Sequence, residues 1–355
     1  MKLLIISNMS HYLRDGQLVG WGPTVEEIDA LATIFEEITH IGCLHSEQAP
    51  ASSLPYHADN IRFVPLPPAG GDNLGAKLGI LRFSPVYLST ILRELKFVDM
   101  VHLRCPANIP LLALILLTFL SKPKFRWFKY AGNWRPNKKS PLSSAFQRHW
   151  IQTNYSRGIG TINGIWPDQP AHIYSFYNPC LTEKDIIEGK AAAEKKELTC
   201  PVNLLFVGAL NEAKGVGQLL EIAEQLLFAK VPFSLKIVGD GPDIKRYQSW
   251  CVEHGISDMI YFLGWIPHNE LGRVYSEAHI ILLPSQSEGW PKVLSEAMAY
   301  GVVPIASNVS SIPQILNECR CGRAVDPEDL EGFCQAIMDY VNHPDLWERE
   351  KISGI

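Results

Sequence analysis

The sequence predicts an α/β protein made of two doubly wound domains with parallel sheets. The 355-residue chain is long enough for two domains of ordinary size. Short apolar runs alternate with amphipathic stretches along much of it, which is the rhythm of buried strands joined by helical crossovers. We expect one domain over residues 1–178, a connector over 179–201 and a second domain over 202–340, with 341–355 beginning a terminal helix that crosses back. In such a protein the domains face each other across a cleft, and ligands bind at the carboxyl ends of the strands.

The second half shows this rhythm most clearly. NLLFVG, FSLKIVG, MIYFLGW, HIILLPS and VVPIAS are apolar runs typical of buried strands. Between them lie stretches with apolar residues at helical spacing, such as VGQLLEIAEQLLFA and DIKRYQSWCVEHG. The Gly-rich turn IVGDGP lacks the spacing GxGxxG, so it does not indicate dinucleotide binding.

The first half repeats the pattern less regularly. KLLIIS, THIGCLH, DMVHLRC and KFRWFKYAG are predicted strands, and TVEEIDALATIFEEI is a predicted helix. The longest apolar run, 109–120, has about 12 residues, too few for the ~20 that span a bilayer, so we expect a buried helix. PLPPAGGDNLG (65–75) is predicted to be a loop and YNPCLTEKDIIEGKAAAEKKELTCP a connector.

Charge divides the chain unevenly. Residues 1–178 carry a net charge of +5 and residues 179–355 carry −10. No carboxylate lies between Asp99 and Asp168, an interval with ten Lys and Arg residues. Such a block attracts an anionic partner, whether nucleic acid, a membrane surface or a phosphorylated substrate. Eight scattered cysteines without metal-ligand spacing, and an N-terminus unlike a signal peptide, predict a cytoplasmic protein.

The segment PSQSEGWPKVLSEAMAYG (284–301) joins a predicted strand to a predicted helix. Pro291 suits the first helical position, and Gly301 suits its end. The amides of Gly289, Trp290 and Lys292 then face the ligand edge from a helix N-terminus, which favours oxygen-rich or anionic ligands. Taken alone, Glu288 and Glu296 could be two solvated surface charges or could both bind the hydroxyl groups of one ligand.

Lys214 stands where another predicted helix begins, in FVGALNEAKGVGQLL. A lysine beside free amides at a helix start is suited to phosphate, although an exposed lysine is the simpler reading. The segment is not a Walker loop, because GxxxxGK[ST] is absent.

Taken together, VGALNEAKG, IVGDGP, FLGWIP, PSQSEGWPKVLSEAMAYGVVPIAS and SSIPQIL closely resemble the C-terminal domain of family-4 retaining glycosyltransferases of the GT-B fold, within glycosyl transferases group 1. The resemblance is strong over about residues 200–330 and covers the first half only in outline. It implies transfer of a sugar from a UDP- or GDP-sugar to a hydroxyl of a saccharide or lipid-linked acceptor, in the assembly of lipopolysaccharide, capsule or exopolysaccharide. It also implies a metal-independent reaction without a cofactor, and no DxD motif appears in the sequence.

The resemblance assigns roles to particular residues. It implies that Glu288 and the amides from Gly289 to Lys292 hold the donor sugar, that Glu296 holds the ribose and that Lys214 stabilises the diphosphate leaving group. Trp265 and Ile266 would border the base. A loop at Gly20-Trp21-Gly22 looks like the family's glycine loop, so Gly22 is expected beside the diphosphate.

The sequence also departs from the family pattern. Ala209 stands where the family usually has an arginine, which removes half of a cationic pair. Arg104 replaces the family's catalytic-region histidine, and His102 lies two residues earlier. These departures leave a catalytically inactive subunit that binds a nucleotide sugar as an alternative function. A nucleotide-sugar epimerase of related fold is another alternative.

The basic, aromatic segment 122–157 suggests a membrane-facing acceptor side. Lysine, arginine and tryptophan favour an anionic bilayer surface, so we expect Arg126, Trp134 and His102 on this side and a peripheral place on the inner membrane face. A solvated basic surface is the alternative. Nucleic acid is disfavoured, because the second half is acidic and lacks an RNA-binding motif.

Overall fold

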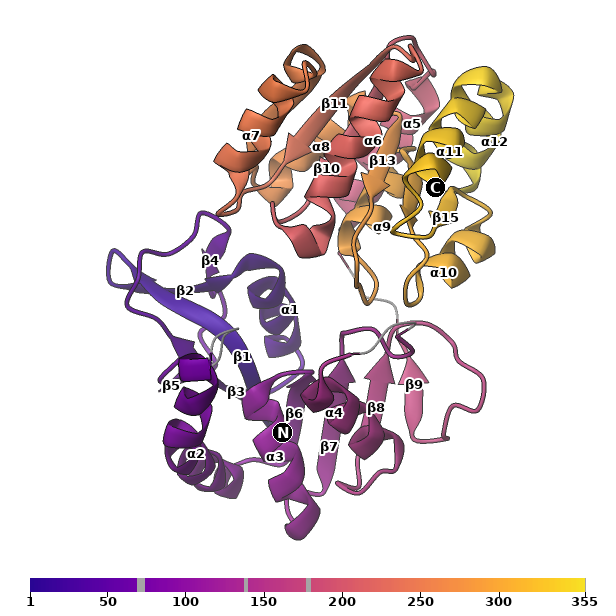
Figure 1. The fold of residues 1–355 in the computed structure, drawn as a ribbon. Coiled ribbons are helices and arrows are strands. Elements are labelled where there is room, and N and C mark those ends of the chain that lie inside the picture. The colour runs from indigo at the N-terminus through magenta and orange to yellow at the C-terminus, as the bar shows by residue number, and fades with distance from the viewer. Residues whose placement is uncertain (69–73, 137–139, 177–179, 355) are drawn as a thin grey trace. The chain divides into compact units, whose positions relative to one another are not determined.

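The computed structural model describes residues 1–68, 74–136, 140–176 and 180–354. The chain divides into two compact units, one of Met1–Trp134 and Lys138–Phe176 and the other of Arg135–Asn137 and Tyr177–Ile355. Each unit is a sheet covered by helices and is described here by itself (Figure 1). The predicted fold of two α/β domains with parallel sheets is confirmed.

The parallel part of the first sheet has the order β5-β3-β1-β6-β7-β8-β9. Its strands are β1 (Lys2–Arg14), β3 (Glu37–Leu44), β5 (Ile61–Leu66), β6 (Met100–Cys105), β7 (Phe125–Tyr130), β8 (Ile159–Ile162) and β9 (Ile173–Ser175). The helices are α1 (Gly22–Ala32), α2 (Leu74–Glu94), α3 (Asn108–Phe119) and α4 (Leu142–Gln152). Helix α3 is the predicted apolar helix, and it packs on β1 and β6. The predicted loop 65–75 contains the end of β5 and the start of α2, and residues 69–73 lie outside the described part of the chain.

An antiparallel extension of this sheet was not predicted. Strand β1 continues past the parallel register and turns back through Asp15 and Gly16, both with positive φ, into β2 (Gln17–Trp21). Two residues with positive φ form the tight hairpin turn that matches strand twist. β2 then pairs with β4 (Ser53–Pro55).

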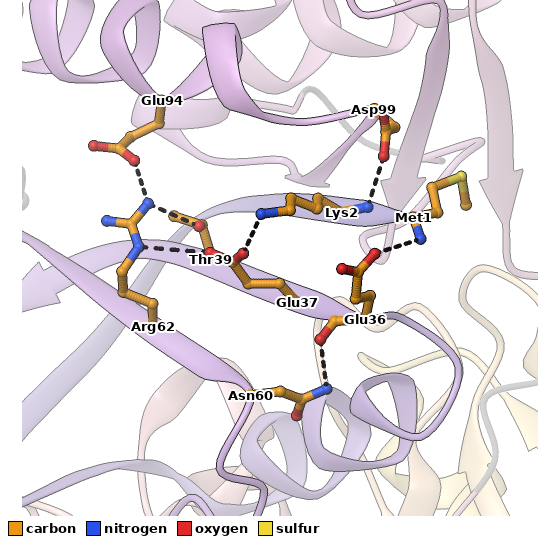
Figure 2. Close-up of polar contacts among 9 residues, drawn as sticks. All are labelled: Met1, Lys2, Glu36, Glu37, Thr39, Asn60, Arg62, Glu94 and Asp99. Atoms are coloured by element: carbon orange, nitrogen blue, oxygen red, sulfur yellow. Dashed lines mark hydrogen bonds and ion pairs between the residues drawn. The ribbon is translucent and has the colours of Figure 1, made fainter.

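A polar network joins the start of β1 to its neighbours (Figure 2). Lys2 pairs with Glu37 of β3, and Arg62 of β5 binds Thr39 and Glu94. The network links three strands and the end of α2 at the edge where the strands begin, opposite the edge on which ligands bind in such sheets.

The second sheet is wholly parallel, with the order β12-β11-β10-β13-β14-β15. Its strands are β10 (Val202–Val207), β11 (Phe233–Val238), β12 (Ile260–Gly264), β13 (Ile280–Leu283), β14 (Val303–Ser307) and β15 (Arg323–Val325). The helices between and after them are α6 (Val216–Phe228), α7 (Ile244–Glu253), α8 (His268–Glu277), α9 (Lys292–Ala299), α10 (Ile312–Cys319) and α11 (Leu330–Asn342). This is the strand order 3-2-1-4-5-6 of a nucleotide-binding sheet, and its direction of winding reverses between β10 and β13.

Two further helices pack on the second unit. The predicted connector 179–201 contains α5 (Glu183–Lys195), which begins with a Thr182 capping box and contacts α8 and α9. The terminal segment forms α12 (Pro344–Ser353), whose buried Trp347 donates to His279 O. Lys351 of the same helix donates to Lys196 O, and α12 also contacts β14 of the second sheet. In the described part of the chain, no helix combines the length and apolarity that crossing a membrane requires.

Candidate active site

The predicted donor residues Lys214 and Glu288 come from the two loops at the switch point of the second sheet. Lys214 follows β10, and Glu288 follows β13, the neighbouring strand on which the winding reverses. Loops at this place diverge to opposite faces and leave a crevice at the carboxyl ends of the strands, where such sheets bind ligands.

The backbones of the two loops approach each other closely at Gly215. Its φ is +74°, and a Cβ there would lie 2.0 Å from Pro284 O, so no larger residue fits. Gln286 N donates to Ala213 O at 3.0 Å, which ties the loops together a few residues away. Glycine at this position therefore sets the approach of Lys214 to Glu288.

Lys214 and Glu288 form an ion pair. Lys214 Nζ donates to Glu288 Oε1 at 2.6 Å, and the side chains are 33% and 9% exposed, respectively. The pair satisfies a nearly buried carboxylate, and it holds one cation and one acceptor within reach of the same ligand. A phosphate oxygen suits the ammonium group, and a sugar hydroxyl suits the carboxylate.

Helix α9 begins beside Glu288. Pro291 is its N-cap rather than its first residue, and Lys292 is the first. Trp290 is buried and donates to Ser295 Oγ, while Gly289 O accepts a hydrogen bond from Ser311 Oγ. These contacts hold the Gly289–Lys292 segment at the carboxyl end of the sheet.

The end of α9 was predicted correctly. Gly301 has φ +67°, and its N–H donates to Met298 O, while Val302 N donates to Ala297 O. This is the Schellman arrangement, which glycine favours.

Glu296 lies inside α9 with its carboxylate buried. Tyr275 Oη donates to Glu296 Oε2 at 2.7 Å, and His268 Nε2 lies 3.5 Å from Oε1. Burial, together with Glu296, raises the pKa of Tyr275 well above its usual value, so the phenol stays a donor. Glu296 is not a solvated surface charge, and each of its oxygens already has one neighbour within the unit. Each oxygen also keeps further acceptor capacity.

Trp265 and Ile266 directly follow β12 at the same edge of the sheet. Trp265 is 37% exposed, and Ile266 packs partly against the core. An exposed ring at the carboxyl end of a strand offers a flat apolar surface.

Arg104, at the end of β6 in the first unit, belongs to a buried charged cluster. Its Nη2 lies 3.0 Å from Glu27 Oε2 and 3.3 Å from Thr24 Oγ1, and Lys129 Nζ lies 2.6 Å from Glu27 Oε1. Burial opposes the ionisation of Glu27, but Arg104 and Lys129 outweigh it and lower the pKa of Glu27 to about 2. The cluster therefore holds two cations and one anion, a net positive charge. Glu27 and Lys129 were not identified from the sequence, because no local motif marks them.

A cavity of about 450 Å³ opens beside Arg104 in the same unit. It lies beside β1 and the end of β6. Carbon atoms make up most of its surface, and six of its twelve lining residues carry a hydroxyl group: the lining is Ser7, Asn8, Met9, Ser10, Tyr12, Trp21, Thr24, Pro50, Ser52, Ser53, Arg104 and Ala107. We call it the hydroxyl-lined cavity. Trp21 is 55% exposed.

Three residues expected on a membrane or acceptor surface lie in the interior instead. Arg126 is buried and donates to four backbone carbonyls, those of Leu117, Leu120, Pro123 and Ser156. Trp134 packs edge-on against Tyr130, and the ring of His102 lies fully buried against Trp127. Composition identifies such residues as basic or aromatic, but it does not show which of them the sheet buries.

The prediction that the amides of the Gly20-Trp21-Gly22 loop are free to bind a diphosphate is also wrong. Gly20 pairs with His11 in the β1–β2 hairpin, and Gly22 N donates to Ser52 O at 3.0 Å. The amide of Gly22 therefore already has an acceptor, and a Cβ at Gly22 would touch Leu54 and Ser52. Glycine is needed here for packing between α1 and β4.

Residues 190–353 match the model of the Glycosyl transferases group 1 family. This part of the chain is thus similar in sequence to that family, and the matched range includes Lys214, Glu288 and Glu296.

Curated relatives match part of the chain. An uncharacterized glycosyltransferase of Haemophilus influenzae is 33% identical over 147 residues, which cover 41% of this chain and 40% of that protein. The lipopolysaccharide 1,6-galactosyltransferase of Escherichia coli K12 is 27% identical over 50% of this chain and 48% of its own. A putative colanic acid biosynthesis glycosyltransferase, WcaL, of Salmonella typhimurium is 28% identical over 41% of this chain and 38% of its own. The matches thus span less than half the length of these relatives.

Solved structures resemble the whole chain. Sucrose-phosphate synthase from Thermosynechococcus elongatus aligns with a TM-score of 0.72 at 16% identity, covering 100% of this chain and 93% of that one. HepE of Anabaena, solved with UDP and glucose, aligns with a TM-score of 0.66 at 14% identity, over 100% and 93% of the two chains. The chain therefore has the GT-B fold of two Rossmann-like domains.

Proposed function

We propose that this protein is a retaining glycosyltransferase that moves a sugar from a nucleotide diphosphate sugar to a hydroxyl acceptor. The observation that carries the proposal is the Lys214–Glu288 pair at the switch point of the second sheet, 2.6 Å between Nζ and Oε1. A cation and a carboxylate from neighbouring loops match the two ends of a sugar diphosphate. The family match of residues 190–353 supports the same assignment.

In this proposal Lys214 turns to the diphosphate, where it stabilises the charge that grows on the leaving group. Glu288 then accepts hydrogen bonds from the hydroxyls of the donor sugar, with the amides of Gly289 and Trp290 nearby. Glu296 accepts from the ribose, and its hydrogen bond from Tyr275 orients it. Trp265 and Ile266 border the base.

The proposed reaction needs neither a protein nucleophile nor a metal ion. In the described residues, no group of three or more His, Cys, Asp and Glu side chains is placed to hold a metal. We infer metal independence from the family resemblance and from the absence of a DxD motif in the sequence. Arg104, with its net positive cluster, is proposed to bind an oxygen of the substrates from the first unit.

Surface glycan assembly is the proposed setting, with a saccharide or lipid-linked acceptor. The relatives include proteins named for colanic acid, lipopolysaccharide and O-antigen synthesis. HepE and TarM were solved with UDP, which favours a UDP-sugar over a GDP-sugar as donor.

The proposed membrane contact is the tip between α3 and β7. Phe119 and Phe125 are 80% and 61% exposed there, and Lys122 and Lys124 are exposed between them. Arg157, also exposed, donates to the carbonyls of Thr118 and Leu120 beside the tip. Exposed aromatic rings among lysines and arginines suit the interface of an anionic bilayer.

Release of nucleoside diphosphate tests the activity. The full chain is incubated with UDP-glucose, UDP-galactose and GDP-mannose, with and without a saccharide acceptor. Lys214→Met and Glu288→Gln should each lower kcat/KM about a hundredfold or more, the size of a lost charged contact in the transition state. Lys236 and Glu277 form an ion pair at the surface of the same unit, so Lys236→Met and Glu277→Gln are matched controls that should keep full turnover.

A nucleotide-sugar-binding subunit without activity is the second candidate, favoured by Ala209 in place of a cation. It predicts donor binding that Lys214→Met weakens, but no turnover with any acceptor. Turnover that survives both Lys214→Met and Glu288→Gln would reject the proposed site.

A further inference from the structure

A hydrogen-bonded chain runs from the hydroxyl-lined cavity into the core of the first unit. Ser7 Oγ lies 2.8 Å from His40 Nε2, and His40 Nδ1 lies 2.8 Å from Tyr56 Oη. The same phenol oxygen lies 2.9 Å from His11 Nε2, and His11 Nδ1 lies 3.1 Å from Met9 O. Ser7 lines the cavity, so one end of this relay meets whatever binds there.

The direction of every bond in the relay follows from its last member. A carbonyl only accepts, so His11 Nδ1 carries a proton and donates to Met9 O. In a neutral ring His11 Nε2 is then an acceptor, and Tyr56 Oη donates to it. Because a phenol has one proton, Tyr56 accepts from His40 Nδ1–H, and His40 Nε2 in turn accepts from Ser7 Oγ–H.

Both rings are neutral near pH 7. Burial lowers the pKa of His11 to about 4 and lowers the pKa of His40 well below its usual value. Arg104 adds to the effect at His40, because a nearby positive charge disfavours the imidazolium.

The relay makes the Ser7 hydroxyl an acceptor only. Its proton is committed to His40, and one lone pair receives Met9 N–H at 3.2 Å. The remaining lone pair accepts a hydrogen bond and cannot donate one. Arg104, on the lining of the same cavity, has only donors. A ligand therefore meets Ser7 with a hydroxyl or amino hydrogen and meets Arg104 with an oxygen.

We propose that Ser7 accepts a hydrogen bond from a hydroxyl or amino group of a saccharide bound in the hydroxyl-lined cavity, and that His40 and Tyr56 are positioning residues that fix the direction of this bond. This inference rests on the proposed function in taking that saccharide as the acceptor. The mixture of hydroxyls with the exposed Trp21 ring suits a polyhydroxylated ring.

The first test needs no variant. Long-range ¹⁵N NMR of the histidine rings reports which nitrogen carries the proton, and the relay predicts Nδ1–H with a bare Nε2 for both His40 and His11. A proton on Nε2 of His40 would overturn the relay. Tyr56→Phe should abolish the preference of His40 for the tautomer with a proton on Nδ1. Tyr87→Phe removes a different phenol of the same unit, a buried one that donates to Pro67 O, and should leave both rings unchanged.

The second test measures binding of methyl α-D-glucopyranoside and methyl α-D-galactopyranoside to the full chain by saturation-transfer NMR. Ser7→Ala and Tyr56→Phe should each raise the Kd about fivefold, the effect of one neutral hydrogen bond, while Tyr87→Phe should leave the Kd unchanged. Equal effects of Tyr56→Phe and Tyr87→Phe, or binding of neither glycoside, would overturn the assignment. Hydrolysis of the donor without an acceptor depends on the proposed donor site of the second unit. If the unchanged chain hydrolyses none of the donor sugars, that result counts against the proposed function and not against the role of Ser7.

Discussion

At the scale of single residues, the charges that matter most are buried or partly buried and have defined partners. Lys214 and Glu288 are one such pair, and Glu27 with Arg104 and Lys129 is another group. A buried ion is stable only with its partner, so removing one member leaves the other desolvated and uncompensated. Variants of Glu27 therefore test stability, and variants of Lys214 and Glu288 test donor binding and turnover.

Glu27→Gln should destabilise the first unit by about 3–5 kcal/mol, because Arg104 and Lys129 then lose the buried carboxylate that lies between them. Glu27 has a folded pKa of about 2, lower than the ~4.3 of an unfolded glutamate. Its stabilisation is therefore complete above pH of about 4.3 and is lost as the pH falls toward 2. Urea unfolding from pH 7 to pH 2.5 measures this loss.

The matched control is Glu36→Gln, a 70% exposed carboxylate paired only with the N-terminus among the described contacts. It should change the free energy of unfolding little, as surface pairs do. If both variants behave alike over this pH range, Glu27 is not held ionised by its neighbours.

The sequence was informative about residues that directly follow strands. The loops that carry Lys214, Glu288 and Trp265 were recognisable because each follows an apolar strand, at the edge where parallel sheets place their ligands. The roles of these residues stay predictions. Ser7, His11, His40 and Tyr56 were missed because their contacts join positions 16 to 45 residues apart, and no local pattern marks them. Arg126 and Trp134 were misplaced because charge and aromaticity do not reveal burial.

At the scale of elements, the contact between the loops after β10 and β13 determines the geometry of the site. Gly215 makes it possible, since its backbone lies where a side chain would strike Pro284 O. The second sheet was predictable because its buried strands alternate regularly with amphipathic helices. The β1–β2 hairpin was not, because the end of β1, HYLR, does not alternate between apolar and polar residues.

Gly215→Ala should lower the free energy of unfolding by more than the ~1 kcal/mol that a positive φ costs a residue with a Cβ. The further loss arises because the clash with Pro284 O forces the two loops apart. It should also weaken donor binding, since Lys214 moves away from Glu288. Gly255→Ala is the control: its φ is +67°, but no atom lies within 4 Å of the added Cβ. Guanidinium unfolding and donor titration of both variants measure these effects. Equal losses of unfolding free energy in the two variants would mean that the contact between the loops is not tight.

At the scale of the whole molecule, the exposed tip between α3 and β7 is proposed to bind a bilayer. Phe119→Ser with Lys124→Glu should lower the fraction of protein that pellets with vesicles of phosphatidylglycerol and phosphatidylcholine, because it removes an apolar anchor and reverses a charge. Phe228→Ser with Lys230→Glu changes an exposed pair of the second unit in the same way and should have no effect. Pelleting that is insensitive to lipid charge and to salt would contradict the proposal.

The central claim is that Lys214 and Glu288 bind one nucleotide sugar between the loops after β10 and β13. A crystal structure of the full chain soaked with UDP-glucose or UDP-galactose tests it most directly. We predict a diphosphate oxygen on Lys214 Nζ and a sugar hydroxyl on Glu288, with the 2.6 Å hydrogen bond between the two side chains broken. A donor bound elsewhere while that bond stays intact would contradict it.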